Sequence, residues 1–151
     1  MLKLLIFAPC EKVILGEDKS TSLIGLLEAL EVGISTSEDL PLDAAAPLQW
    51  HVLALWQRTE SVNEDIQYQQ RIEVVRPDGH VAGWGMLEFT VTDKHENFRN
   101  VLKMPAIPIG VAGRCLIKVS LRRIGGPDLE WHEFGQYPLR IIHKKVEPQN
   151  A

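Results

Sequence analysis

The chain has 151 residues, of which 45% are hydrophobic and 24% are charged, and its formal net charge is −4 at pH 7. These values predict one globular domain over residues 1–151 and suggest neither disorder nor a membrane span. The net negative charge also argues against a general affinity for nucleic acid or anionic lipid.

The first predicted element is one long or broken strand over Leu2–Leu15, with Pro9 marking an edge or a bend. Its apolar start is too short for an export signal, so we expect a cytoplasmic protein. Cys10 in this run and Cys115 in a later one stand among apolar residues. That context predicts two buried, reduced thiols.

The next segment, Ser22–Val32, fits either a strand or a helix. Its apolar positions match both patterns, but Gly25 would cost a helix about 1 kcal/mol, so we prefer a strand and keep a helix over Ser22–Leu30 as the alternative. Prolines predict a loop over Ser35–Pro47. Leu48–Arg58 is apolar on both faces, which is typical of a central strand under a second layer.

Glu64–Asp93 carries the clearest signal, a hairpin of two strands. Polar residues alternate in its first half with four apolar residues, Ile66, Tyr68, Ile72 and Val74. This period of two predicts a strand with one buried face. Arg76–Gly79 then has the proline, aspartate and glycine of a tight turn.

A four-residue turn fixes the expected pairing of this hairpin. Val74 would lie opposite Val81, and Tyr68 opposite Leu87. Trp84 would then point to the polar face, unless a bulge at one of the glycines beside it changes the parity.

Three or four more strands are expected towards the end of the chain. Asn97–Ile109 is interrupted by two prolines, which confine it to an edge or a crossover. Leu129–His143 forms the last strand or pair of strands, and Lys144–Ala151 is a polar, frayed tail. Between these two, Gly113–Arg123 alternates between inward apolar residues and four outward ones, Arg114, Lys118, Ser120 and Arg122.

About eight or nine strands, with no sustained helix and no internal repeat, predict an all-β fold. The expected architecture is a two-layer antiparallel β-sandwich, immunoglobulin-like or jelly-roll-like.

Five short segments carry a family resemblance: Cys10–Ile14, Ser22–Gly25, Ala54–Trp56, Glu73–Gly79 and Gly113–Ile117. With them, nearly the whole chain resembles an uncharacterised family of small bacterial proteins of unknown function. The resemblance implies a cytoplasmic bacterial β-sandwich, and it supplies no activity, cofactor or site residue.

No motif for catalysis or metal binding is visible. The sequence has no serine elbow and no phosphate-binding glycine loop. None of the paired spacings of metal ligands occurs among the five histidines, His51, His80, His95, His132 and His143. We therefore expect no catalytic residue, no cofactor, no metal and no enzyme activity, and an enzyme with a site assembled from dispersed residues is the last alternative.

Two sets of side chains are candidates for binding. The outward row Arg114, Lys118 and Arg122 is either an anion or RNA site or a charged face that guards a sheet edge. Aromatic rings either stack on sugars or pack in the core. The four aromatic candidates are Tyr68, Trp84, Trp131 and Tyr137.

The leading functional hypothesis is a noncatalytic sandwich that binds a protein partner or itself, because a large apolar pair is set in a polar surround. We expect a homodimer or another partner contact that covers Trp84. The alternative is a module that binds carbohydrate or an anion. The predicted interaction surface comprises Trp84, Met86, Arg114, Lys118 and Arg122.

Overall fold

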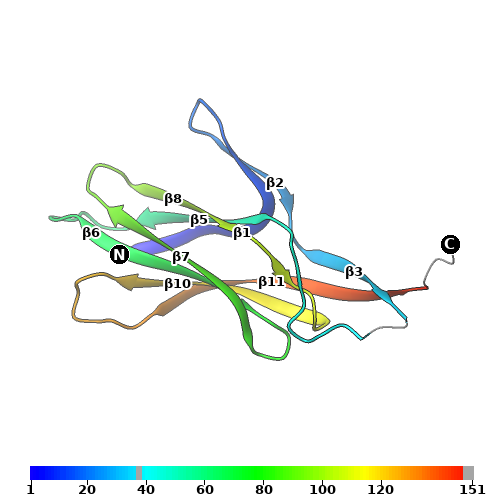
Figure 1. Cartoon of the computed structure of the whole chain (residues 1–151). Coiled ribbons are helices and arrows are strands. Elements are labelled where there is room, and N and C mark those ends of the chain that lie inside the picture. The colour runs from blue at the N-terminus through cyan, green and yellow to red at the C-terminus, as the bar shows by residue number, and fades with distance from the viewer. Residues whose placement is uncertain (37–38, 148–151) are drawn as a thin grey trace.

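The computed structural model describes residues 1–36 and 39–147, which form two packed β-sheets (Figure 1) and a small two-stranded ladder. The strands are β1 (Leu2–Leu15), β2 (Thr21–Leu26), β3 (Ala29–Ser35), β4 (Ala45–Ala46), β5 (Trp50–Arg58), β6 (Ile66–Val75), β7 (Val81–Val91), β8 (Asn97–Met104), β9 (Ile107–Pro108), β10 (Gly113–Arg123) and β11 (His132–Val146). The described residues include no helix, so none that could span a membrane. The predicted all-β, sandwich-like fold is confirmed.

The strand order is β2-β1-β5-β8 in the four-stranded sheet and β3-β11-β10-β6-β7 in the five-stranded sheet, while β4 pairs with β9. The expected count omitted the two-residue strands β4 and β9. β4 lies in the predicted loop Ser35–Pro47, and β9 lies in the proline-containing part of the predicted strand Asn97–Ile109. These two strands pair with each other.

The core lies between the two sheets. The inward residues of β5 include Trp50 and Trp56, which have no exposed surface, and β5 lies between β1 and β8 as a central strand should. Across the interface, Ile117 and Val119 of β10 are equally buried. These strands are therefore held by apolar burial, the main stabilising contribution in a sandwich of this size.

The segment Ser22–Val32 forms parts of two strands, so the helical alternative is wrong. Gly25 has φ 68°, a left-handed conformation that interrupts a right-handed helix and favours glycine. After β2 the chain leaves the β1 hairpin and joins the other sheet, where β3 pairs with β11 in parallel. This pairing is a departure from the expected antiparallel sandwich.

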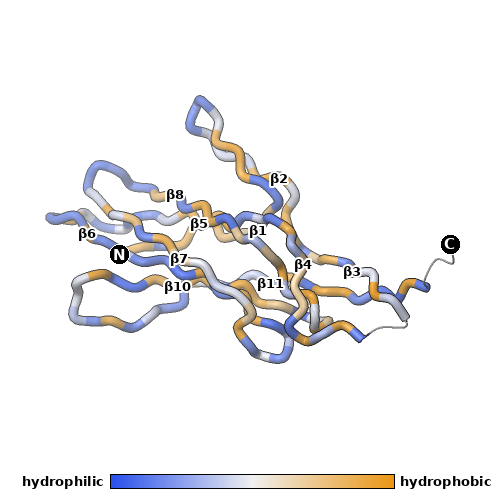
Figure 2. The backbone as a smooth tube through the Cα atoms, in the orientation of Figure 1, coloured by the Kyte–Doolittle hydropathy of each residue, from blue (hydrophilic) through white to orange (hydrophobic). Residues whose placement is uncertain are grey.

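The β1–β2 hairpin projects from the body of the sandwich (Figure 1). Figure 2 shows apolar residues along its strands and a hydrophilic tip. Ile14 and Leu15 on one strand and Ile24 and Leu26 on the other are exposed. A contact from β8 reaches the tip, where Arg99 Nη2 donates to the Lys19 carbonyl oxygen at 3.1 Å.

The β6–β7 hairpin forms, but its expected register is wrong by two residues. The loop runs from Arg76 to His80 and is closed by a 2.8 Å bond from the Arg76 N–H to the His80 carbonyl oxygen. Val75 then pairs with Val81 and Val74 with Gly83, so a bulge falls at position 82. One extra loop residue and one bulged residue shift the register by an even number, which leaves the residues from Gly83 onward on their predicted faces. Val81, expected opposite the buried Val74, instead pairs with Val75 and is 52% exposed.

Two further expectations are corrected at the other strands. Ser120 is buried although it shares the outward parity of β10, because it lies between the longer Arg71 and Glu133 of the neighbouring strands. The expected frayed tail begins too early, since Lys144–Val146 belongs to β11 and pairs with β3. Within the rest of the predicted tail, residues 148–151 lie outside the described residues.

A buried polar contact joins the sheets. Gln70 is fully buried on the inward face of β6, and its Oε1 accepts from Trp56 Nε1 at 2.8 Å and from Asn100 Nδ2 at 2.9 Å. Both donors belong to the four-stranded sheet. The contact satisfies Gln70 Oε1 and both donors, whereas Gln70 Nε2 is buried with no hydrogen-bond partner among the described residues.

Cys10 and Cys115 are both buried and free, as the sequence predicts. Burial raises the pKa of the Cys10 thiol. The same desolvation raises the pKa of Cys115 from 9.0 to about 11.

The Cys115 thiol should make stability fall at high pH. The unfolded thiol ionises near pH 9.0 while the folded thiol stays protonated to about pH 11. The stabilisation of the folded state by the protonated Cys115 thiol is therefore present below pH 9.0, and it is lost as the pH rises from 9.0 to about 11. Urea unfolding of the wild type and of Cys115→Ala across this window measures the effect, and we expect the smaller fall in the variant. An equal fall in both proteins would contradict the prediction.

Candidate protein-binding surface

The outer face of the five-stranded sheet carries an exposed apolar pair on its edge strand β7. Trp84 is 64% exposed and Met86 is 41% exposed. Trp84 pairs with Glu73, and Met86 pairs with Arg71, so the apolar pair lies directly beside charged residues of β6. The expected outward orientation of both apolar side chains is confirmed.

A second tryptophan reaches the same face from the loop before β11. The Trp131 ring centre lies 4.4 Å from the guanidinium carbon of Arg71 and 4.5 Å from that of Arg122. Such cation–π contacts contribute about 0.5–1 kcal/mol each at partly exposed sites. They attach the loop to β6 and β10 and place a second indole near Trp84.

The charges on this face are unequally paired. Arg71 Nη2 lies 3.0 Å from Glu73 Oε1, which forms an ion pair within β6. Arg122 instead donates to the neutral Gln69 Oε1, from Nε at 3.0 Å and from Nη2 at 2.5 Å. Within residues 1–36 and 39–147, Arg122 makes no salt bridge. Its positive charge is available to a partner.

These side chains enclose a shallow depression of about 290 Å³, which we call the tryptophan hollow. Its lining comprises Arg71, Glu73, Trp84, Met86, Arg122 and Trp131. Two indoles and a thioether supply apolar contact, and the guanidinium and carboxylate groups supply directional polar contacts. This combination is typical of protein interfaces, in which tryptophan, methionine and arginine are enriched.

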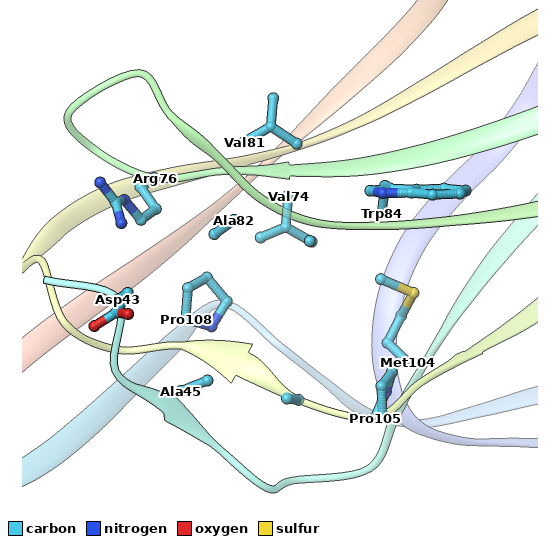
Figure 3. A pocket seen from close by; sticks show the side chains of 12 residues that line it. Asp43, Ala45, Val74, Arg76, Val81, Ala82, Trp84, Met104, Pro105 and Pro108 are labelled. Carbon is cyan, nitrogen blue, oxygen red and sulfur yellow. The ribbon is translucent and has the colours of Figure 1, made fainter.

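A second depression of about 370 Å³, the edge pocket, lies on the other side of Trp84 (Figure 3). Val81–Trp84 of β7 form one wall, and Ala45, Pro105 and Pro108 line the opposite side. Figure 3 shows Trp84 at one end and Arg76 near Asp43 at the other. Trp84 thus lines both depressions and stands at the centre of the surface.

The three basic residues of the predicted row, Arg114, Lys118 and Arg122, do not line one common site. Arg122 lines the tryptophan hollow, whereas Lys118 Nζ lies 3.6 Å from Glu133 Oε1 in an ion pair. Arg114 pairs across the strands with Arg140 and lines neither depression. Of the three basic residues predicted to form a row, Arg122 alone lines the surface around Trp84.

The four aromatic candidates also lie in different environments. Tyr68 stacks on Phe89 with ring centres 5.8 Å apart, and both pack against the core. Tyr137 also packs against the core. Trp84 and Trp131 alone of the four candidates line the tryptophan hollow.

Sequence reasoning missed several parts of this surface. Arg71 carries no signal that distinguishes it from the other alternating polar residues of Glu64–Asp93, and no local signal connects Asp43, Pro105 or Pro108 with Trp84. These residues are brought together by the pairing of β4 with β9 and by the packing of that ladder near β7. A search for short motifs cannot detect such a distant combination.

The histidines that form hydrogen bonds contact different parts of the structure. His51 Nδ1 lies 2.9 Å from the Glu11 carbonyl oxygen, and His132 Nε2 lies 2.6 Å from Asp128 Oδ2. In the part of the chain that the structure describes, no group of three or more histidine, cysteine or acidic side chains could hold a metal ion.

No protein-family model matches the chain, and no curated protein matches it significantly. Among solved structures, the N-terminal domain of PorA is similar at 8% identity and a TM-score of 0.27, over 92% of this chain and 98% of that one. A likeness of this size indicates no function.

Proposed function

We propose that the protein is a noncatalytic binding module that associates with a second copy of itself through the surface around Trp84. The observation that carries this proposal is the exposure of Trp84 and Met86 side by side on a sheet edge, surrounded by charged groups. Isolated exposed apolar residues are ordinary, but a contiguous group with a polar rim is typical of an interaction site. The two buried free thiols support a cytoplasmic setting.

The energetics of such a surface favour Trp84 as its centre. Tryptophan and arginine are the residues that most often dominate binding, and they do so when the complex excludes water around them. Trp84 is open on both sides, towards the tryptophan hollow and towards the edge pocket. A partner that covers it would bury a large apolar side chain without disturbing the sandwich core.

We expect Trp84→Ala to weaken self-association by at least about 30-fold, which corresponds to a hot spot of about 2 kcal/mol. Its free energy of unfolding should change little, since Trp84 lies outside the core. Light scattering coupled to size-exclusion chromatography measures the dimer fraction. Leu15→Ala is the matched control, because Leu15 is also exposed, at 59%, but lies on the projecting hairpin. A dimer fraction that Trp84→Ala leaves unchanged would overturn the proposal.

The tryptophan hollow supports a second candidate function, the binding of an anionic carbohydrate. Trp84 offers an exposed ring for stacking, and Arg122 has no carboxylate partner among the described residues. Titration with a uronic acid oligosaccharide, followed by tryptophan fluorescence, tests this candidate. A saturable change that Arg122→Ala abolishes would favour it over self-association.

A further inference from the structure

Strand β7 is an edge strand with little protection against pairing. It ends the five-stranded sheet, and no other strand of the described residues pairs with its free side. Its eleven residues contain no proline and a single charged residue, Glu88. Edge strands normally carry lysines, prolines or inward charges that prevent pairing with another chain. The bulge at Ala82 interrupts the regular pairing of β7 only near its first residue, Val81, next to the hairpin loop.

We propose that the second copy binds by antiparallel pairing of β7 with β7, about a twofold axis at Gly85, so that the two five-stranded sheets become one continuous sheet. This inference rests on the proposed self-association and adds its mode and register. An antiparallel pair of identical strands is an isologous contact, the closed arrangement that gives a dimer. Each edge thereby gains backbone hydrogen bonds and loses its free side.

The register follows from the side chains on the outer face. With the axis at Gly85, Trp84 of each copy lies opposite Met86 of the other, which produces two apolar cross-strand pairs in the middle of the contact. Glu88 lies opposite Ala82, so the charged residue of one strand meets a methyl group. An axis at Glu88 would instead bring two carboxylates together, which is destabilising.

The inner face accommodates the same register. Leu87 of the second copy lies opposite Gly83, and a Cβ built at Gly83 would meet no atom within 4 Å. This open space adjoins the edge pocket, which Gly83 lines together with Met104 and Pro105. An apolar side chain of the second copy therefore has room beside Gly83 and an apolar wall to contact.

Cysteine cross-linking tests the register. Ala82 and Glu88 are both exposed, and in this register they are cross-strand neighbours at the end of the contact, within reach of disulfide formation on oxidation. Mixing A82C with E88C and oxidising should give a cross-linked dimer. Either variant alone should not cross-link, because identical positions are then about 20 Å apart. The native thiols do not interfere, since both are buried.

The control mixture is A82C with Thr90→Cys, which cross-links best if the axis lies at Met86. Preferential cross-linking of the E88C mixture over this control supports the proposal. Dimers that form, and that Trp84→Ala dissociates, without either cross-link would overturn the strand pairing and leave self-association standing. A wild-type protein that stays monomeric would overturn both.

Discussion

Replacing Trp56 by alanine should destabilise the folded protein by about 3 to 5 kcal/mol, the range for deletion of a large buried aromatic side chain. Trp56 is fully buried in the centre of the sandwich, and its ring meets Phe134 edge-on with ring centres 5.1 Å apart. The substitution would also remove the hydrogen bond that Trp56 donates to Gln70 across the two sheets. Folded domains are typically stable by about 5–15 kcal/mol, so the loss would be a large fraction of the total.

Urea unfolding followed by far-ultraviolet circular dichroism measures this loss. Trp56→Phe is the matched control, because it keeps most of the aromatic volume and removes the donor, while Asn100 still donates to Gln70 Oε1 at 2.9 Å. We expect the phenylalanine variant to lose much less stability than the alanine variant. Equal losses would show that the hydrogen bond, and not the packing of the ring, dominates at this position.

Gly110→Ala should also be strongly destabilising, by at least about 1–3 kcal/mol, the usual cost of overpacking. A Cβ at Gly110 would lie 2.2 Å from the Pro41 carbonyl oxygen and 2.3 Å from that of Leu42. Both are backbone atoms, so the clash cannot be relieved by turning a side chain. The loop around Asp43 would have to move, and the edge pocket would lose part of its wall.

Gly83→Ala provides the control for this effect. A Cβ at Gly83 meets nothing within 4 Å, so the free energy of unfolding of the monomer should change by no more than about 0.5 kcal/mol. Thermal unfolding of both variants at low protein concentration makes the comparison. If the two variants have equal free energies of unfolding, the loop around Pro41 does not lie as close to Gly110 as the structure shows.

The sequence predicted side-chain faces better than it predicted pairing. Alternation in β6 and β7 placed Trp84 outward, and it is outward, although the expected pairs were displaced by two residues. Faces depend only on parity, and an even displacement preserves it. The pairing depends on loop length and on the bulge at position 82, which the residues around Gly79 do not specify.

Other features depend on contacts between distant parts of the chain. β3 pairs with β11 in parallel because the chain changes sheet after β2. No turn motif in the sequence predicts that change of sheet. Gln70 is a polar residue at an inward position, and its partners Trp56 and Asn100 belong to other strands. For the same reason the sequence could name Trp131 as a candidate but could not place it against Arg71.

The measurement that tests self-association most directly is sedimentation velocity of the wild-type protein over a wide range of concentrations. We predict a species of twice the 17.0 kDa chain mass at high concentration, which dissociates towards the single chain on dilution. A constant mass of 17.0 kDa at every concentration would contradict the proposed function.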